Sequence, residues 1–160
     1  MKPIQSLIAF VVLIAATGCE TTGGARRQAA GVARETVVAG IAAEPKGAYY
    51  VGRRYFKTEY KFWGWVRRSG EPWSTAKLVV MNERNKFIPD RQAGKPGSDN
   101  NVEYKLLGEF SGDTIYEPAS NGFYPEFVLR GYEVLSTNPG PIYRDSGATN
   151  PDRRIIAQPY

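Results

Sequence analysis

A dense set of cations and aromatic rings between residues 53 and 68 is the strongest candidate for chemistry in this sequence. Six lysines and arginines stand there against a single acid, Glu59. Aromatic rings that stack on a ligand, interleaved with cations that meet phosphates, are how small β-barrels hold single-stranded nucleic acid or sugars. The predicted ligand-binding residues are Arg53, Lys57, Lys61, Trp63, Trp65 and Arg67.

The same stretch alternates with a period of two over residues 54–66, which predicts a strand with one apolar side and one basic, aromatic side. Both tryptophans fall on the basic side. Two interpretations stay open. Either this side is an exposed surface for an anionic or sugar ligand, such as lipopolysaccharide or cell-wall glycan, or it is scaffold whose tryptophans belong to the core or lie under the C-terminal segment. Nucleic acid is the less favoured ligand.

Residues for catalysis or metal binding are scarce. The chain has no histidine and one cysteine, Cys19, which excludes His-based acid–base chemistry and removes the commonest zinc ligands. Residues 98–103 gather oxygen atoms without the spacing of a calcium loop, which favours a turn. Asp113, Glu117 and Glu126 fall on a predicted hairpin, and a carboxylate hydrolase is a distant alternative because it needs two carboxylates at a set separation. We therefore expect no enzyme, no catalytic residue, no metal and no cofactor.

The first nineteen residues have the features of an export signal. Lys2 supplies the positive charge that is typical of the N-terminal region of a signal peptide. The apolar run from Leu7 to Ala16 is too short for a membrane span, which needs about 20 residues. Small residues, Ala16-Thr17-Gly18, precede Cys19. This segment resembles the lipoprotein signal peptide of bacteria, although leucine is usual in that family where Ala16 stands. In the family, a diacylglycerol is attached to the cysteine thiol, a peptidase cuts before the cysteine, and the new amine is acylated.

The resemblance, which extends to small uncharacterised outer-membrane lipoproteins, implies lipid attachment at Cys19. Two or more acyl chains are what stable anchoring needs. In enteric members an aspartate after the cysteine favours the inner membrane, so Glu20 points to the periplasmic face of the outer membrane. Two alternatives stay open: cleavage of an ordinary signal peptide after Gly18, and an uncleaved N-terminal anchor.

Residues 19–47 are predicted to be a lipidated tether with a weak helix. Residues 20–28 are small and polar, which indicates a flexible tether. Within residues 29–43, Ala30, Ala33, Val37 and Ile41 recur at helical spacing and define one face. Interior glycines weaken this helix by about 1 kcal/mol each relative to alanine.

Residues 48–136 are predicted to form one β domain with strands over 54–66, 75–82, 102–110, 113–117 and 123–135. Gly64, Gly108 and Gly131 lie inside predicted strands, where glycine permits the sharp bends of a small barrel. The expected fold is all-β: a small, partly open five-stranded barrel of the OB or SH3-like kind. Residues 137–160 are proline-rich and predict an extended tail that either lies along the barrel or stays disordered.

Together these features predict a non-enzymatic, lipid-anchored envelope protein. Its β domain would interact with protein partners or serve a structural role. The alternative function is a binding module for an anionic or sugar ligand through the basic and aromatic residues of the first strand. The formal charge of +5 suits contact with anionic surfaces.

Overall fold

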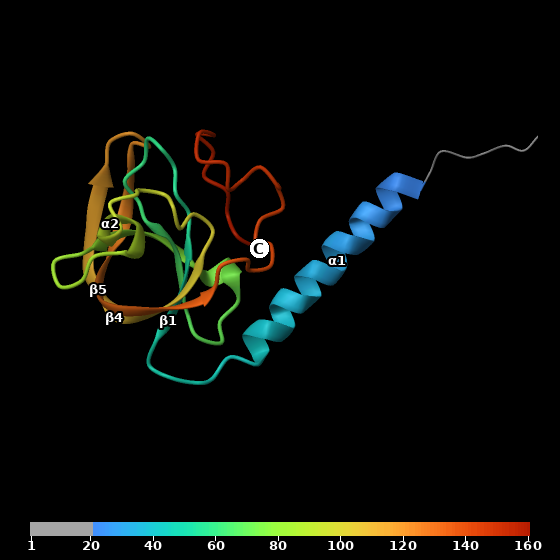
Figure 1. Cartoon of the computed structure of the whole chain (residues 1–160), viewed down its shortest axis with the longest axis horizontal. Helices are drawn as coiled ribbons and strands as arrows, with labels where there is room; N and C mark the ends of the chain where they lie inside the picture. Colours follow the sequence, from blue (N-terminus) through green and yellow to red (C-terminus); the bar gives the residue numbers. More distant parts are fainter. Residues whose placement is uncertain (1–20) are drawn as a thin grey trace, which may run out of the picture.

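The computed structural model describes residues 21–160 of the chain (Figure 1). A long helix, α1 (Thr21–Ala42), leads into a β-barrel of five strands. The strands are β1 (Tyr50–Arg54), β2 (Gly64–Arg68), β3 (Lys77–Asn82), β4 (Glu103–Glu117) and β5 (Gly122–Ser136). A 3-10 turn, η1 (Trp73–Thr75), precedes β3, and a short helix, α2 (Pro89–Gln92), lies between β3 and β4. The predicted signal peptide and Cys19 fall outside the described residues.

The five strands close into one barrel in the order β1-β2-β3-β5-β4. Every neighbouring pair is antiparallel except β3 and β5, which run parallel. This order, with its single parallel pair, is that of an OB-type barrel. The predicted five-stranded barrel is therefore confirmed, and it is closed rather than partly open.

β4 and β5 form a hairpin of two 15-residue strands, much longer than the other three. The prediction of separate strands over 102–110 and 113–117 is wrong, because β4 continues through both and absorbs the break as register shifts near Gly108 and after Phe110. A Cβ at Gly108 would lie closer than 3.0 Å to the carbonyl oxygen of Val128. A side chain at position 108 would therefore clash with the backbone of β5.

Apolar side chains form two separate layers. The interior of the barrel is filled by Trp63, Val66, Val79, Ile88, Tyr104, Leu106, Phe127 and Leu129. The second layer lies on the outer face of β1, β2 and β3 and includes Val51, Tyr55, Phe62, Trp65, Trp73 and Leu78 from the barrel side. Ile142, Tyr143 and Ala148 of the C-terminal segment complete it. The outer face of these strands is therefore covered by the chain's own end.

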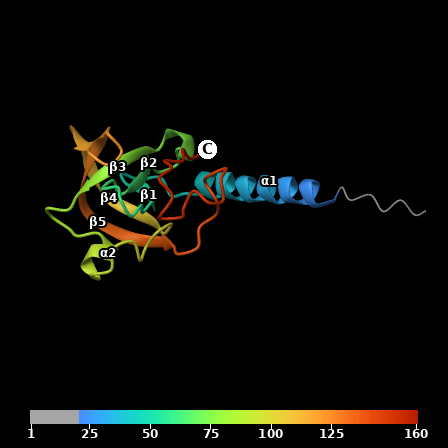
Figure 2. The ribbon, with the colours of Figure 1, turned by 90° about the horizontal axis from the view of Figure 1, so that it is seen from above.

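Residues 137–160, hereafter the tail, contain no helix or strand but pack along the barrel. The sequence left open whether this segment lies along the barrel or stays disordered, and the structure shows that it lies along the barrel. Figures 1 and 2 show the tail between the barrel and the nearer part of α1. The tail thus belongs to the same folded unit as the barrel.

Helix α1 is longer than predicted. It begins at Thr21 and not near residue 29, so the predicted flexible tether over 20–28 is wrong from Thr21 onward. Alanine, arginine and glutamine are strong helix formers, and they carry the helix through the glycines of its first turns. Ala33, Val37 and Ile41 are half-buried on one face, as predicted, whereas Ala30 is exposed. Most of the remaining surface of α1 faces solvent.

The prediction of one strand over residues 54–66 is also wrong. β1 ends at Arg54, residues 55–63 form a loop, and β2 begins at Gly64. The loop amide of Thr58 donates to the carbonyl oxygen of Pro151 in the tail. The alternation of apolar and polar residues in this stretch therefore does not mark a continuous strand, because most of it belongs to a loop that contacts the tail.

Candidate functional site

The predicted binding residues of the first stretch do not form an exposed face. Arg53, Lys57, Trp63, Trp65 and Arg67 are buried, and only Lys61 is exposed. The prediction of a solvent-facing basic and aromatic surface is therefore wrong. The physical reason is that the tail and the end of α1 cover the outer face of β1 and β2. The second interpretation left open by the sequence, in which the tryptophans belong to the core or lie under the C-terminal segment, is therefore the one found.

The two tryptophans do not share a face. Trp65 points outward into the layer under the tail, whereas Trp63 fills the barrel interior. Trp63 precedes β2, so the strand alternation does not extend to it. A Cβ atom added at Gly52 would lie 2.8 Å from the nearest ring atoms of Trp63. Glycine at position 52 therefore makes room for the indole inside the barrel.

Arg53 and Arg67 lie side by side in the layer under α1 and the tail, each with its own carboxylate. Arg53 donates to Glu103 at 2.6 Å, and Arg67 donates through both terminal nitrogens to Glu44, just beyond α1. Both guanidinium groups lie over the ring of Trp73, at 5.3 and 4.6 Å from its centroid. Burial lowers the pKa of Arg53, and Glu103 opposes that shift. Arg53 also donates to the carbonyl oxygen of Gly140 in the tail at 3.1 Å. The two arginines therefore hold β1 and β2 to their cover.

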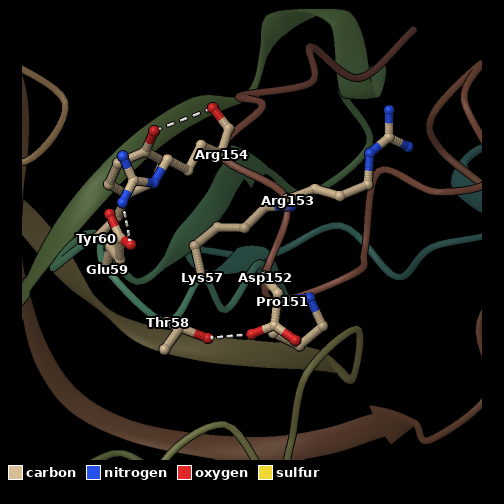
Figure 3. A pocket seen from close by; sticks show the side chains of 8 residues that line it. All are labelled: Lys57, Thr58, Glu59, Tyr60, Pro151, Asp152, Arg153 and Arg154. Atoms are coloured by element: carbon tan, nitrogen blue, oxygen red, sulfur yellow. Dashed lines mark hydrogen bonds and ion pairs between the residues drawn. The ribbon is translucent and has the colours of Figure 1, made fainter.

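Lys57 fixes the tail to the loop between β1 and β2 (Figure 3). Its Nζ donates to the carbonyl oxygens of Ala148 and Asn150, both at 2.7 Å. Thr58 adds a hydrogen bond to Asp152 at 2.9 Å. Burial lowers the pKa of Lys57. The pocket at this junction holds only about 100 Å³, so the lysine serves the tail and is not open to a ligand.

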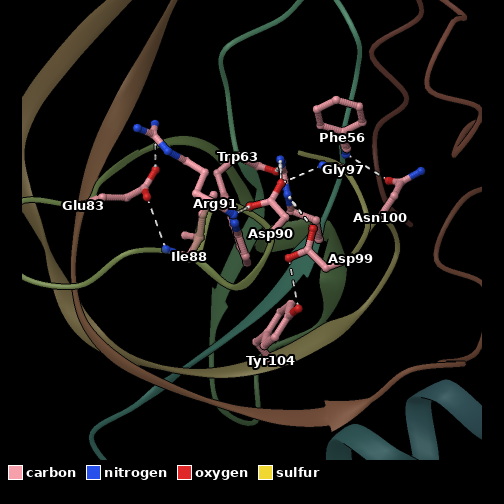
Figure 4. Close-up of polar contacts among 11 residues, drawn as sticks. Phe56, Trp63, Glu83, Ile88, Asp90, Arg91, Gly97, Asp99, Asn100 and Tyr104 are labelled. Atoms are coloured by element: carbon pink, nitrogen blue, oxygen red, sulfur yellow. Dashed lines mark hydrogen bonds and ion pairs between the residues drawn. The ribbon is translucent and has the colours of Figure 1, made fainter. Parts of the chain in front are cut away.

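A buried charge cluster at one end of the barrel went unrecognised in the sequence (Figure 4). Arg54 contacts Asp90 at 3.0 Å and Asp99 at 3.3 Å, and the hydroxyl of Tyr104 donates to Asp99 at 3.0 Å. Burial raises the pKa of Asp99, and Arg54 lowers it. Asp90 and Asp99 are both buried, so the cluster is part of the folded interior.

The signals for this cluster were indirect. Asp99 belongs to the polar run 98–103, which the sequence indicated as a turn. Asp90 lies in the first turn of α2, where its carboxylate accepts from the backbone amides of Arg91 and Gly97. Nothing in the spacing of these residues along the chain indicates that both aspartates meet Arg54.

Two of the three carboxylates of the predicted hairpin, Glu117 and Glu126, are engaged in hydrogen bonds, whereas Asp113 is exposed. Glu117 is buried and accepts from the backbone amides of Ala119 and Ser120 in the hairpin turn. Burial raises its pKa, but these hydrogen bonds, together with those from the Ser120 side chain and the Lys61 backbone, lower it by more, and the net shift is downward. Glu126 accepts a hydrogen bond from Asn82 at 2.9 Å. Their arrangement supports the turn and the β3–β5 junction.

A cavity of about 470 Å³ lies between the last turns of α1, the segment 135–140 and the barrel. Its barrel side is formed by Arg53, Arg67, Trp73 and Glu103, and Glu44 closes it beyond the end of α1. Two residues of the predicted binding set therefore meet at a hollow, but under the helix and not on an open strand face.

Comparison of the chain with protein-family models, with curated proteins and with solved structures finds no match. Within residues 21–160, no group of three or more Cys, Asp or Glu side chains is placed to hold a metal ion. The helices of the same range are too short or too polar to cross a membrane.

Proposed function

We propose that this chain is a non-enzymatic, lipid-anchored envelope protein, held in the membrane through Cys19, whose barrel domain interacts with protein partners. The observation that carries the proposal is the position of α1. It begins two residues after Cys19 and contacts the rest of the chain mainly through its C-terminal half. A 22-residue helix is about 33 Å long. α1 therefore suits a spacer that holds the barrel away from a lipid surface (Figures 1 and 2).

The anchor is tested by fractionating cells that express the full chain. Cys19→Ser is expected to abolish labelling by an acyl-chain probe and to release the protein from membranes, because it removes the only thiol in the chain. Thr22→Ser, a matched change three residues away, should leave both unchanged. Membrane retention and labelling of Cys19→Ser would refute lipidation at this residue. Glu20→Asp is expected to move the protein from the outer to the inner membrane fraction.

A surface for a protein partner is suggested by the β4–β5 hairpin. Phe123 is 70% exposed, the largest exposed fraction among the large apolar side chains of residues 23–160. It packs against half-exposed Tyr116, with ring centroids 5.2 Å apart. Figures 1 and 2 place the turn between β4 and β5 on the side of the barrel away from α1. An anchored protein would thus carry the aromatic pair away from its own membrane.

The partner surface is tested by placing a photo-crosslinking amino acid at position 123 in native envelopes. A discrete crosslinked product is expected there, and it should disappear when Tyr116→Ala is added. The control places the crosslinker at Arg26, an exposed position on α1. Identical products from both positions, or none at position 123, would contradict an interaction through the hairpin.

A further inference from the structure

Figures 1 and 2 show α1 and the tail next to each other, and a groove lies between them, nearer the N-terminus of the helix than the cavity described above. Val37 and Ile41 of α1 pack against the layer under the tail. About two turns earlier, Ala30 and Gly31 line the groove, and a Cβ added at Gly31 meets no atom within 4 Å. The groove holds about 460 Å³, within the range of about 300–1,000 Å³ that small-molecule sites occupy.

Two exposed arginines line this groove, Arg34 from α1 and Arg144 from the tail. Neither guanidinium group makes a hydrogen bond or an ion pair with any of residues 23–160. Asp145, the acid next to Arg144, pairs with Arg153 instead, at 2.9 Å. Glu35 follows Arg34 in the helix but does not line the groove. The hydrogen-bond donors of both arginines are therefore available to a ligand.

The ring of Tyr160 orients one of these guanidinium groups. The Cζ of Arg34 lies 5.1 Å from the centroid of this ring. The ring is itself held in place, because its hydroxyl donates to the carbonyl oxygen of Pro141 at 2.6 Å and the backbone amide of Tyr160 donates to Ile142 at 3.0 Å. A cation that already rests on a fixed ring loses less conformational entropy when a ligand binds.

The charge of the groove favours an anion. No Asp or Glu side chain is among the residues that line it, so the two arginines give the lining a charge of +2. The α-carboxylate at the end of the chain, on Tyr160, reduces this charge to +1, but it forms no ion pair with either arginine. Ser146 adds an exposed hydroxyl to the lining.

The donors and the rings together indicate which anion fits. A phosphate group has three acceptor oxygens, and guanidinium groups bind it through parallel, charge-assisted hydrogen bonds. Tyr143 and Tyr160 also line the groove and supply ring surface on which an apolar or aromatic part of a ligand can pack. A molecule that joins a phosphate to such a part therefore matches the whole lining.

We propose that the groove between α1 and the tail binds a small, soluble phosphate ester. Arg34 and Arg144 hold the phosphate, and the organic part packs on Tyr143 and Tyr160. A groove of this volume admits one small molecule, whereas a membrane surface would contact projecting side chains. The site goes beyond the proposed interaction with protein partners and does not depend on the lipid anchor at Cys19.

The test titrates the full-length chain in a neutral detergent with phenyl phosphate, and follows binding by calorimetry and by phosphorus and proton NMR. Phenol, which lacks the phosphate, and inorganic phosphate, which lacks the ring, are the comparison ligands. Phenyl phosphate is expected to bind at least about tenfold more tightly than either, because only it uses both the arginines and the tyrosine rings. Added salt should weaken its binding, since both arginines are exposed.

Three variants locate the site. Arg34→Met and Arg144→Met keep the apolar stem and should each weaken the binding of phenyl phosphate about tenfold. Gly31→Leu should weaken it by at least as much, because the added side chain enters the groove. The matched control is Arg84→Met, which removes an exposed arginine outside the groove and should bind as the unmodified chain does. Circular dichroism checks that each variant keeps the fold.

Three results would overturn the proposal. The first is no binding of phenyl phosphate, and the second is equal binding by the two arginine variants and Arg84→Met. The third is binding of the Cys19→Ser chain to phosphatidylglycerol vesicles, but not to phosphatidylcholine vesicles, without any binding of phenyl phosphate. That result would assign the arginines to contact with an anionic membrane. Cys19→Ser should bind phenyl phosphate unchanged, so a failure of the lipid anchor and a failure of this site are distinguishable.

Discussion

Replacing Arg54 with methionine tests whether the charge cluster at the barrel end holds the fold together. The arginine is the cation that contacts both Asp90 and Asp99, and all three side chains are buried. Arg54→Met keeps a long apolar stem but leaves two buried carboxylates without their cation. Breaking a buried pair by removing one partner costs about 3–5 kcal/mol. A loss of this size is a large fraction of the 5–15 kcal/mol that stabilises a typical domain.

The pH dependence gives the prediction a second, independent part. Burial already holds the pKa of Asp99 above its ordinary value of 3.8, and Arg54 opposes that shift. Without the arginine the pKa rises further. An acid with a raised folded-state pKa stabilises the fold fully below its unfolded pKa, and this contribution is lost as pH rises through the folded pKa. The destabilisation by Arg54→Met is therefore expected to be largest at pH 7 and to shrink toward pH 4.

Urea unfolding followed by near-ultraviolet circular dichroism at pH 7, 5.5 and 4 measures both effects. The matched control is Arg130→Met, which removes an exposed arginine that pairs with Glu109 on the hairpin. A surface pair of this kind is worth about 0–1 kcal/mol. Equal losses for the two variants, or a loss for Arg54→Met that stays constant with pH, would refute the stabilising role of this buried cluster.

Two further predictions concern the backbone of the hairpin and the tail. Gly108→Ala brings a Cβ closer than 3.0 Å to a carbonyl oxygen of β5 and should lower the free energy of unfolding by about 1–3 kcal/mol. The control is Gly131→Ala, whose Cβ meets only a leucine side chain at 3.5 Å. This variant should be neutral or stabilising by up to about 1 kcal/mol. Equal urea midpoints for the two would contradict the close approach of β4 and β5. Lys57→Met leaves two carbonyl oxygens of the tail without their donor, and it should cost about 2–3 kcal/mol and speed proteolysis within residues 145–160. Lys61→Met, an exposed neighbour, should change neither the urea midpoint nor the cleavage rate.

Local patterns predicted much of the barrel correctly. Turn residues and short apolar runs located β3 and β5, and period-two alternation located the first part of β4, each to within a few residues. The helical spacing of Ala33, Val37 and Ile41 identified the face of α1 that packs. Gly64, Gly108 and Gly131 were expected inside strands at sharp bends, and the structure shows at the first two a close approach of backbone. A Cβ at either one would lie closer than 3.0 Å to a backbone oxygen. These features depend on neighbouring residues, so the sequence carries them directly.

The candidate site was much less predictable. Period-two alternation says that two sides of a strand differ, but it does not say what covers each side. Arg53 and Arg67 look like solvent-facing cations until the partners Glu103 and Glu44 are known, and these lie 50 and 23 residues away. Trp63 and Trp65 shared a side in the sequence, but the strand begins only at Gly64, so they separate.

By itself, the sequence determined a small all-β domain after an N-terminal helix, because strand and helix periods and turn residues act over short ranges. The predicted number of strands agrees only because one strand was expected where β1 and β2 lie and two were expected where β4 lies. Only the tertiary structure decided that the barrel closes, that the tail is ordered over β1–β3, and that five of the six predicted binding residues are buried. These outcomes depend on contacts between segments up to about a hundred residues apart, such as Tyr55 with the carbonyl oxygen of Ile155. Burial of a charged side chain is decided by where its partner arrives, and no local pattern records that.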